Sequence, residues 1–402
     1  MSSGPLSGIR ILDMTSVVLG PVATQLLADW GADVVKVEPL AGDLMRANGV
    51  SLHKGMSSIF LAINRNKRSL AVDVKTPRGA QVMRRLIPTV DAFVHNMRVR
   101  AIERLGLGYD AVAAIRPDIV YCVATGFGQD GPYRDKPAFD DIIQSACGLV
   151  GLNRANLGAA EYVPSLMADK TIGVFLANAV LAALVHRMRT GEGQHVEVPM
   201  YETMSAFMLA EHLGGLTFEP PPAASGYARI LAGGRRPVPT LDGHISMLPY
   251  TEEHWVAFLT EAGHAEAIDR LQVRNRYERN RNIKPLYALL AQIVGGQTTA
   301  HWMQVCERLD IPATPIHEFD DLPEHPHLKA VGLFQQAEHP TEGPIRYVRP
   351  TVKFSASPAS VRRQAPVLGE DNASVLGELG YSAEEIDDML REGVLARAPA
   401  RG

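Results

Sequence analysis

The sequence has few cysteines, few aromatic residues and no dominant charge, and each shortage excludes a class of protein. Its 402 residues include only three cysteines, Cys122, Cys147 and Cys306, which lie far apart along the chain. They form neither a disulfide framework nor a zinc-ligand spacing, so a reducing, cytoplasmic compartment is expected. Aromatic residues make up 6% of the chain and the formal net charge is −4. That charge argues against a nucleic-acid or membrane partner held by bulk electrostatic attraction.

Long apolar runs are also missing. The first residues contain no basic stretch followed by an apolar one, so no signal peptide is expected. The most apolar segment covers residues 172–185, which is shorter than a membrane span requires. We therefore expect a buried helix there. An apolar fraction of 46% with 21% charged residues is typical of a folded chain.

Familiar cofactor and hydrolase motifs are absent. The first expected strand is followed by residues 15–21, Thr-Ser-Val-Val-Leu-Gly-Pro, and not by the G-x-G-x-x-G of dinucleotide-binding proteins. The chain contains no P-loop, H-E-x-x-H, G-x-S-x-G or paired-cysteine zinc pattern. No metal site is expected.

The first half of the chain alternates short apolar strands with helical periods. We expect strands at 9–13, 33–38, 69–74, 91–95, 119–125 and 195–198, and helices at 22–30, from 76 onward, 100–115 and 170–189. This alternation predicts an α/β fold with a mostly parallel, doubly wound sheet. Ligands bind beyond the carboxyl ends of such strands. Residues 13–15, 38–39, 95–96 and 125–128 should then share one functional edge.

A second module begins near Arg235, after a proline-rich connector at residues 218–224. Asp242 and Gly243 predict a hairpin turn, and helical periods follow over residues 253–309. Gly233 and Gly234 suggest a mobile loop tipped by Arg235 and Arg236, which would suit a carboxylate substrate; an ordinary surface loop fits equally well.

Asp169 stands at the start of the long apolar helix and allows two interpretations. On position alone, a helix N-cap is favoured. A helix N-terminus also stabilises an anion, and a nucleophilic carboxylate must be an anion. Gly173, in the first turn, would let a ligand approach the backbone. Position does not separate the two interpretations.

Basic residues gather in two stretches, each beside the carboxyl end of an expected strand. The first contains Arg65, Lys67, Arg68 and Lys75, and the second contains Arg98, Arg100 and Arg104. A solvated surface is the commoner explanation for any one of them. Together they fit a phosphate-bearing ligand better. Phe139 is either a core aromatic residue or a wall of a ligand pocket.

Taken together, these motifs resemble the class III CoA-transferase family, also called CaiB/BaiF or formyl-CoA transferase-like. Residues 6–13, 31–39, 64–69, 73–77, 103–109, 191–194 and 368–370 carry the resemblance. It implies a Rossmann-like large domain built from residues 1–225 and 323–402. It also implies a smaller α+β domain inserted at residues 226–322, and an interlocked homodimer.

The resemblance further implies a mechanism. Asp169 would attack the thioester of an acyl-CoA donor, with succinyl-CoA a candidate, and pass CoA to a carboxylic acid through an aspartyl anhydride and an aspartyl-CoA thioester. CoA would be a substrate, with no permanently bound cofactor. The residues expected to contact CoA are Val18, Leu19, Val72, Asp73, Val74, Lys75, Asn96, Met97, Arg98, Arg104, Phe139 and Asp140.

Some positions depart from the family pattern. Formyl-CoA transferases have Gln at Val18 and Arg at Pro39, and a longer glycine-rich loop near Gly233, which argues against formyl-CoA and oxalate as substrates. Arg235 and Arg236 favour a dicarboxylate. One alternative is an α-methylacyl-CoA racemase, which needs a second acid/base where Phe139 stands. Another is a CoA-binding protein without catalysis.

Overall fold

The computed structural model describes residues 4–231 and 235–398. Gly233 and Gly234 of the expected mobile loop lie outside these residues. The chain packs as two compact units: unit 1 comprises Met1–Cys147, Val163–Phe207 and His327–Gly402, and unit 2 comprises Gly148–Tyr162 and Met208–Pro326. The boundaries of the smaller inserted domain, expected at residues 226 and 322, stay a prediction.

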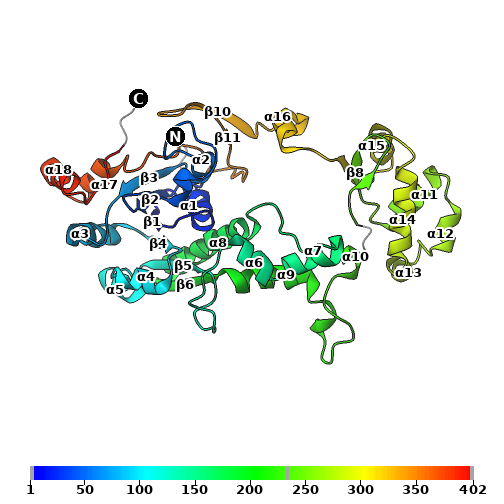
Figure 1. The fold of residues 1–402 in the computed structure, drawn as a ribbon, viewed down its shortest axis with the longest axis horizontal. Coiled ribbons are helices and arrows are strands. Elements are labelled where there is room, and N and C mark those ends of the chain that lie inside the picture. Colours follow the sequence, from blue (N-terminus) through cyan, green and yellow to red (C-terminus); the bar gives the residue numbers. More distant parts are fainter. Residues whose placement is uncertain (1–3, 232–234, 399–402) are drawn as a thin grey trace. The chain divides into compact units, whose positions relative to one another are not determined.

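Unit 1 is built on a six-stranded parallel sheet (Figure 1). Its strands are β1 (Arg10–Met14), β2 (Asp33–Glu38), β3 (Lys67–Ala71), β4 (Ala92–His95), β5 (Val120–Thr125) and β6 (Gln194–Pro199). They lie in the order β3-β2-β1-β4-β5-β6, and every neighbouring pair is parallel. The expected parallel α/β sheet is confirmed, because buried apolar strands that alternate with helices pair in this way.

Helices cover both faces of this sheet. The helices of the chain are α1 (Leu19–Asp29), α2 (Ser58–Ile63), α3 (Pro77–Leu86), α4 (Val99–Arg104), α5 (Tyr109–Ile115), α6 (Asp140–Ala146), α7 (Leu149–Leu157), α8 (Met167–Thr190), α9 (Met200–His212), α10 (Ala228–Leu231), α11 (Glu252–Glu261), α12 (Glu266–Arg270), α13 (Arg276–Arg281), α14 (Ile283–Val294), α15 (Thr299–Arg308), α16 (Pro326–Ala330), α17 (Asn372–Glu378) and α18 (Ala383–Arg391), with short 3-10 turns at Leu44–Ala47, Ile87–Thr89, Gly214–Thr217 and Phe319–Glu324. On one face, α3, α4, α5, α17 and α18 form a buried apolar cluster with the strand residues Leu12, Val35 and Phe93. Helix α8 packs along α1 and contacts β5 and β6.

One expectation about helices was wrong. The single helix expected at residues 100–115 is two helices, α4 and α5. Gly106 lies between them at φ +69°, a left-handed conformation that ends a helix and that glycine adopts easily. The helix expected over residues 170–189 is α8, which extends this range slightly, to Met167–Thr190. Among the described residues, the 24-residue α8 is the one helix long and apolar enough to span a membrane, but half of its most apolar window is buried, and its contacts are those of a core helix.

Unit 2 contains a three-stranded antiparallel sheet of β7 (Val238–Pro239), β8 (His244–Met247) and β9 (Ala313–Pro315). Asp242 and Gly243 lie between β7 and β8, so the expected hairpin is confirmed. Helices α11, α12, α14 and α15 enclose an aromatic-rich core with Trp255, Phe258 and Trp302. A further antiparallel pair, β10 (Phe334–His339) and β11 (Gly343–Val348), lies in unit 1.

Gly173 brings α8 against α1. A Cβ atom at this position would lie 2.7 Å from the backbone oxygen of Leu19 and 3.1 Å from Cγ1 of Val22. Real Cβ atoms do not approach backbone so closely, so the two helices need glycine to pack at this distance. Gly173 therefore makes room for helix α1, and not for the ligand that the sequence suggested.

We expect Gly173→Ala to destabilise the protein by about 1–3 kcal/mol, because overpacking forces α1 away from α8. Gly377→Ala is the matched control: it also lies in a helix, and its Cβ would meet nothing within 4 Å. The control should be neutral or stabilising by up to about 1 kcal/mol. Urea unfolding of both variants measures the difference. Equal midpoints would contradict the packing argument.

Candidate functional site

A cavity of about 270 Å³ lies in unit 1 beyond the carboxyl ends of β1, β4 and β5. β1 and β4 are neighbours in the sheet although two strands separate them in sequence, so strand order reverses here. Doubly wound sheets bind ligands at such a point. The lining residues are Ser16, Val17, Leu19, Leu44, Asn96, Met97, Arg98, Val99, Ala124, Thr125, Gly126, Gln129, Arg134, Lys136, Pro137, Ala138, Phe139, Asp169 and Met200.

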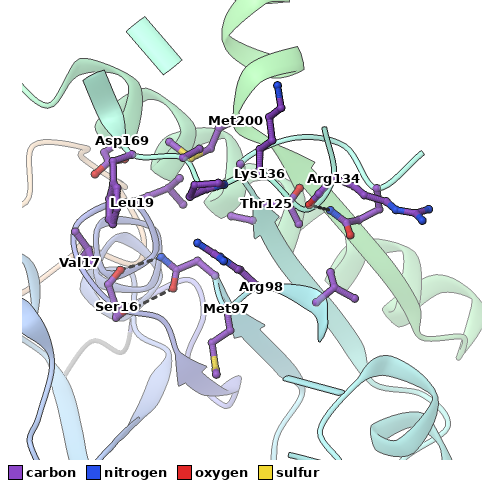
Figure 2. A pocket seen from close by; sticks show the side chains of 18 of the residues that line it. Ser16, Val17, Leu19, Met97, Arg98, Thr125, Arg134, Lys136, Asp169 and Met200 are labelled. Carbon is purple, nitrogen blue, oxygen red and sulfur yellow. Dashed lines mark hydrogen bonds between the residues drawn. The ribbon is translucent and has the colours of Figure 1, made fainter. Parts of the chain in front are cut away.

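One wall of the cavity is a strained turn after β1. Val17 has φ +70°, a left-handed conformation that is costly for a β-branched residue. Its amide N–H donates to Oδ1 of Asp43 at 3.1 Å. The Asn96 side chain accepts from the Ser16 N–H and donates to the Ser16 carbonyl, each at 2.9 Å (Figure 2). Asn96 therefore holds the β1 turn to the β4 turn, and Asp43 holds the strained residue.

Asp43 belongs to a layer of charges buried under this turn. Lys36 Nζ lies 2.9 Å from Asp43 Oδ2 and also donates to the backbone oxygen of Thr15 at 2.8 Å. Each charge in this pair has a partner, as burial requires. The fixed lysine and aspartate thus support both ends of the turn that forms the cavity wall.

The first basic stretch does not line the cavity, and its ligand contacts stay a prediction. Its side chains form ion pairs inside unit 1: Lys67 with Asp13 at 3.1 Å, Arg65 with Asp29 at 2.7 Å, and Arg68 with Asp33 at 2.6 Å. Burial lowers the pKa of Lys67 to about 8. These cations neutralise carboxylates of the sheet and its helices, whereas Lys75 of the same stretch is exposed.

Three cations do line the cavity: Arg98 from the turn after β4, and Arg134 and Lys136 from the loop after β5 (Figure 2). Lys136 Nζ lies 3.5 Å from the centre of the Tyr133 ring. Arginine and lysine at this edge give the cavity the charge that phosphate or carboxylate groups require.

Two carboxylates anchor the glycine-interrupted loop that carries these cations. Glu197 on β6 accepts from the Thr125 hydroxyl at 2.7 Å and from the Gln129 N–H at 3.1 Å. Glu202 on α9 accepts from the Gly128 N–H at 2.9 Å. The loop after β5 is thereby fixed to the elements that follow it in the chain.

Asp169 is the one carboxylate among the lining residues. It lies within the first turn of α8, whose N-cap residue is Leu166, so the expectation of an N-cap was wrong. Its side chain is 7% exposed. Burial, followed by the negative charges of Asp140 and Asp141, raises the pKa of Asp169 to about 7. Burial and like charge outweigh the helix terminus that was expected to keep this carboxylate ionised.

The structure brings together some of the residues expected to bind CoA. The cavity is lined by five of them, Leu19, Asn96, Met97, Arg98 and Phe139, and by the expected nucleophile Asp169. It is not lined by the other seven, Val18, Val72, Asp73, Val74, Lys75, Arg104 and Asp140. Val18 packs in a small core with Phe60. Asp73 donates its N–H to the carbonyl of Val394 near the C-terminus at 2.8 Å. The ligand contacts of these residues stay a prediction.

Sequence reasoning missed several lining residues, among them Ser16, Val17, Arg134, Lys136 and Met200. A signal existed for Arg134 and Lys136, which are cations in the loop directly after an expected strand. Met200 follows the last strand in the same way. No sequence signal pointed to the left-handed conformation of Val17, because tertiary contacts impose it.

The raised pKa of Asp169 predicts a stability effect. The folded protein keeps a proton that the unfolded chain loses above about pH 4, so stability falls as pH rises toward 7. At about 1.4 kcal/mol per pKa unit, the cost at pH 8 is on the order of 4 kcal/mol. Asp169→Asn removes it, so this variant should be more stable than the parent at pH 8, with less than half that gain at pH 5. Urea unfolding at both pH values measures the gain, with the exposed Glu192→Gln as control. A gain independent of pH would contradict the shift.

Comparison with known proteins identifies relatives of this chain. Residues 6–372 match the model of a family described as CoA-transferase family III. A succinate–glutarate CoA-transferase of Agrobacterium fabrum is 33% identical over 387 residues, which cover 93% of this chain and 96% of that protein.

Solved structures agree with the sequence match. An aspartate-to-alanine variant of Rv3272 from Mycobacterium tuberculosis has a TM-score of 0.82 at 28% identity, over 94% of this chain and 99% of that one. A CaiB/BaiF family protein from Brucella suis has a TM-score of 0.79 at 27% identity, over 94% and 100% of the two chains. A family match over most of the chain, with this sheet and this cavity, identifies the protein as an enzyme of CoA-transferase family III.

Proposed function

We propose that this CoA-transferase works through covalent catalysis by Asp169. The observation that supports this most strongly is the position of Asp169: it is a buried carboxylate lining a cavity that also contains Arg98, Arg134 and Lys136. A carboxylate nucleophile needs access to the thioester, and the rest of CoA needs cations for its phosphates. The cavity supplies both within unit 1.

The proposed steps conserve the thioester energy. An oxygen of the Asp169 carboxylate attacks the thioester carbonyl carbon, the C–S bond breaks, and a mixed anhydride and the CoA thiolate result. The thiolate attacks the aspartyl carbonyl carbon, which releases the donor acid and leaves CoA on Asp169 as a thioester. The acceptor carboxylate attacks that thioester, and the same two steps run in reverse order. No oxidant or net proton transfer is required.

The burial of Asp169 suits these steps. A carboxylate whose pKa is about 7 is partly ionised at neutral pH, and its anion is more basic and less solvated than an ordinary aspartate. Apolar side chains of Val17, Leu19 and Phe139 line the same cavity. They limit the water that would hydrolyse an anhydride.

The cations support a dicarboxylic substrate pair, and we propose succinyl-CoA as a donor. A relative named succinate–glutarate CoA-transferase matches over almost the full chain. Three cations at one cavity can serve a second carboxylate as well as phosphates. Arg235 and Arg236, exposed residues of unit 2, and the segment 72–75 with Arg104 remain proposed substrate contacts.

Racemisation is the alternative that uses the same fold. It needs two groups that exchange protons on opposite faces of a carbon. Phe139 stands where the family resemblance implies the second group; it lines the cavity, and its ring exchanges no proton. CoA transfer is therefore favoured over racemisation.

We also propose that the protein is a cytoplasmic homodimer with no resident cofactor. Val174, Phe175, Val185 and Met188 on α8 are each at least 40% exposed. A row of exposed apolar side chains on one long helix suits contact with a second copy. A mass of one chain by light scattering would reject the dimer.

The covalent step has a direct test. On incubation with succinyl-CoA and hydroxylamine, Asp169 should be converted to a hydroxamate, which mass spectrometry of peptides locates. Asp169→Ala should lose this label and at least about a thousandfold of CoA transfer to glutarate, because covalent catalysis needs the carboxylate. Deuterium uptake at the α-carbon without CoA exchange would support the racemase instead. An unlabelled Asp169 in an active enzyme would sink the mechanism.

The pH dependence of transfer tests the electrostatics of the site. Because Asp169 must be ionised to attack, kcat/KM should rise with pH up to about 7 and then level off. The charge of exposed Asp141 helps to raise this pKa, so Asp141→Asn should move the acidic limb of the profile to lower pH. Glu192→Gln, beyond the opposite end of α8, should leave it in place. Superimposable profiles for Asp141→Asn and the parent would refute the role of Asp141.

A further inference from the structure

Gln144 is fully buried and connects two segments of unit 1, helix α6 and residues 163–165. It lies on α6, one helical turn after Asp140. Its Nε2 donates to Asp140 Oδ2 at 2.6 Å, and its Oε1 accepts from the Val163 N–H at 2.9 Å. Nε2 also lies 3.2 Å from the carbonyl oxygen of Ser165. One amide group thus uses both its ends, toward α6 and toward the segment that leads into α8.

Asp140 connects the Gln144 amide to Asp169, the proposed nucleophile. Its second oxygen, Oδ1, accepts from the backbone N–H of Asp169 at 2.9 Å. This N–H belongs to the first turn of α8, where it has no partner within the helix. Asp140 is 4% exposed, and its carboxylate bridges the Gln144 amide and the Asp169 backbone. The position of α8's first turn relative to the cavity therefore depends on the Asp140 rotamer.

Electrostatic repulsion from Asp169 would displace the Asp140 side chain unless Gln144 held it in place. Its charge raises the pKa of Asp169, so the two carboxylates repel when both are ionised. The Gln144 amide donates a hydrogen bond to Asp140 Oδ2. An amide keeps its protons over the whole working pH range, so this bond does not depend on pH. A rotation of Asp140 away from Asp169 would break both hydrogen bonds in a buried site, which is costly.

From this geometry we infer that Gln144 is a positioning residue for the proposed covalent step: through Asp140 and the segment 163–165 it holds Asp169 where it attacks the thioester. It touches no substrate in this arrangement, since it does not line the cavity. Positioning of a nucleophile matters because small displacements from attack geometry cost large factors in rate. The inference rests on the proposed function of Asp169.

Gln144→Met tests it, since methionine has a similar length and no amide. Single-turnover labelling of Asp169 with succinyl-CoA and hydroxylamine gives a rate and an amplitude. We expect the rate to fall on the order of 10- to 100-fold. The amplitude and the Kd for CoA should stay within about threefold, because the cations of the cavity remain in place. Gln81→Met, an exposed glutamine on α3, is the matched control and should change neither.

The outcomes separate the possible failures. An amplitude that falls with the folded fraction while the rate stays the same would mean that Gln144 only stabilises the fold, and would overturn the inference. An unchanged rate would overturn it too. If the parent enzyme itself shows no label on Asp169, the proposed function fails and the inference fails with it.

Gln144→Glu provides a second test, which can be used even if the methionine variant folds poorly. The carboxylic acid that this substitution introduces donates to Asp140 when it is protonated, as the amide does, and repels Asp140 when it is ionised. The labelling rate of this variant relative to the parent, measured on the CoA-binding fraction, should therefore fall as pH rises from about 6 to about 9. A ratio independent of pH would overturn the inference.

Discussion

The carboxylate of Asp169 is held out of water, close to two other negative charges, and the surrounding structure compensates for that. Burial and the charges of Asp140 and Asp141 favour the protonated acid. The amide of Gln144 and the backbone N–H of Asp169 stabilise Asp140 as an acceptor between them. A carboxylate in this setting is a better nucleophile than one in water, because its anion has lost solvation and retained its charge. Burial therefore makes the ionised Asp169 carboxylate more reactive, and it lowers the stability of the folded protein when this carboxylate ionises.

The parallel sheet explains why such different groups meet at one cavity. Each crossover returns the chain to the same edge, so the residues that follow β1, β4 and β5 converge although they are far apart in sequence. Helix α8 brings Asp169 to the same cavity, and Gly173 lets this helix lie against α1. The cavity wall at Val17 is strained, and Asn96 and Asp43 hold it. Strain of this kind persists only where several contacts fix the residue together.

The strands of the sheet could be predicted from the sequence because each strand depends mainly on its own run of apolar residues. Apolar runs such as residues 33–38 form a strand as expected, since a strand buried on both faces needs little else. Topology predicted Asn96 at the functional edge of the sheet, and the resemblance predicted Arg98 and Asp169 as site residues; all three line the cavity. The break between α4 and α5 depended on one glycine inside a helical period, which pattern alone does not weigh. The N-cap assigned to Asp169 failed because α8 already begins at Met167, ahead of the long apolar run. The role of Gln144 depends on a segment 19 residues further along the chain, so no local pattern could reveal it.

The two basic stretches show why position relative to a strand decides the role of a cation. Lys67 lies within β3 and its side chain is fully buried, where an ion pair with Asp13 and hydrogen bonds to Asn64 and Pro21 compensate for the burial of its charge. Arg98 and Lys136 follow the ends of β4 and β5, where their side chains are exposed and line the cavity. Both stretches have the composition of a phosphate site, but only residues beyond the strand end have the freedom to meet an anion. A lysine within a buried strand instead anchors the fold, and through Asp13, Lys36 and Asp43 that anchoring reaches the turn at Val17. The charges inside unit 1 and the charges at the cavity thus belong to one arrangement: the buried pairs fix the cavity wall, and the exposed cations line the same cavity, where we propose that they bind a substrate.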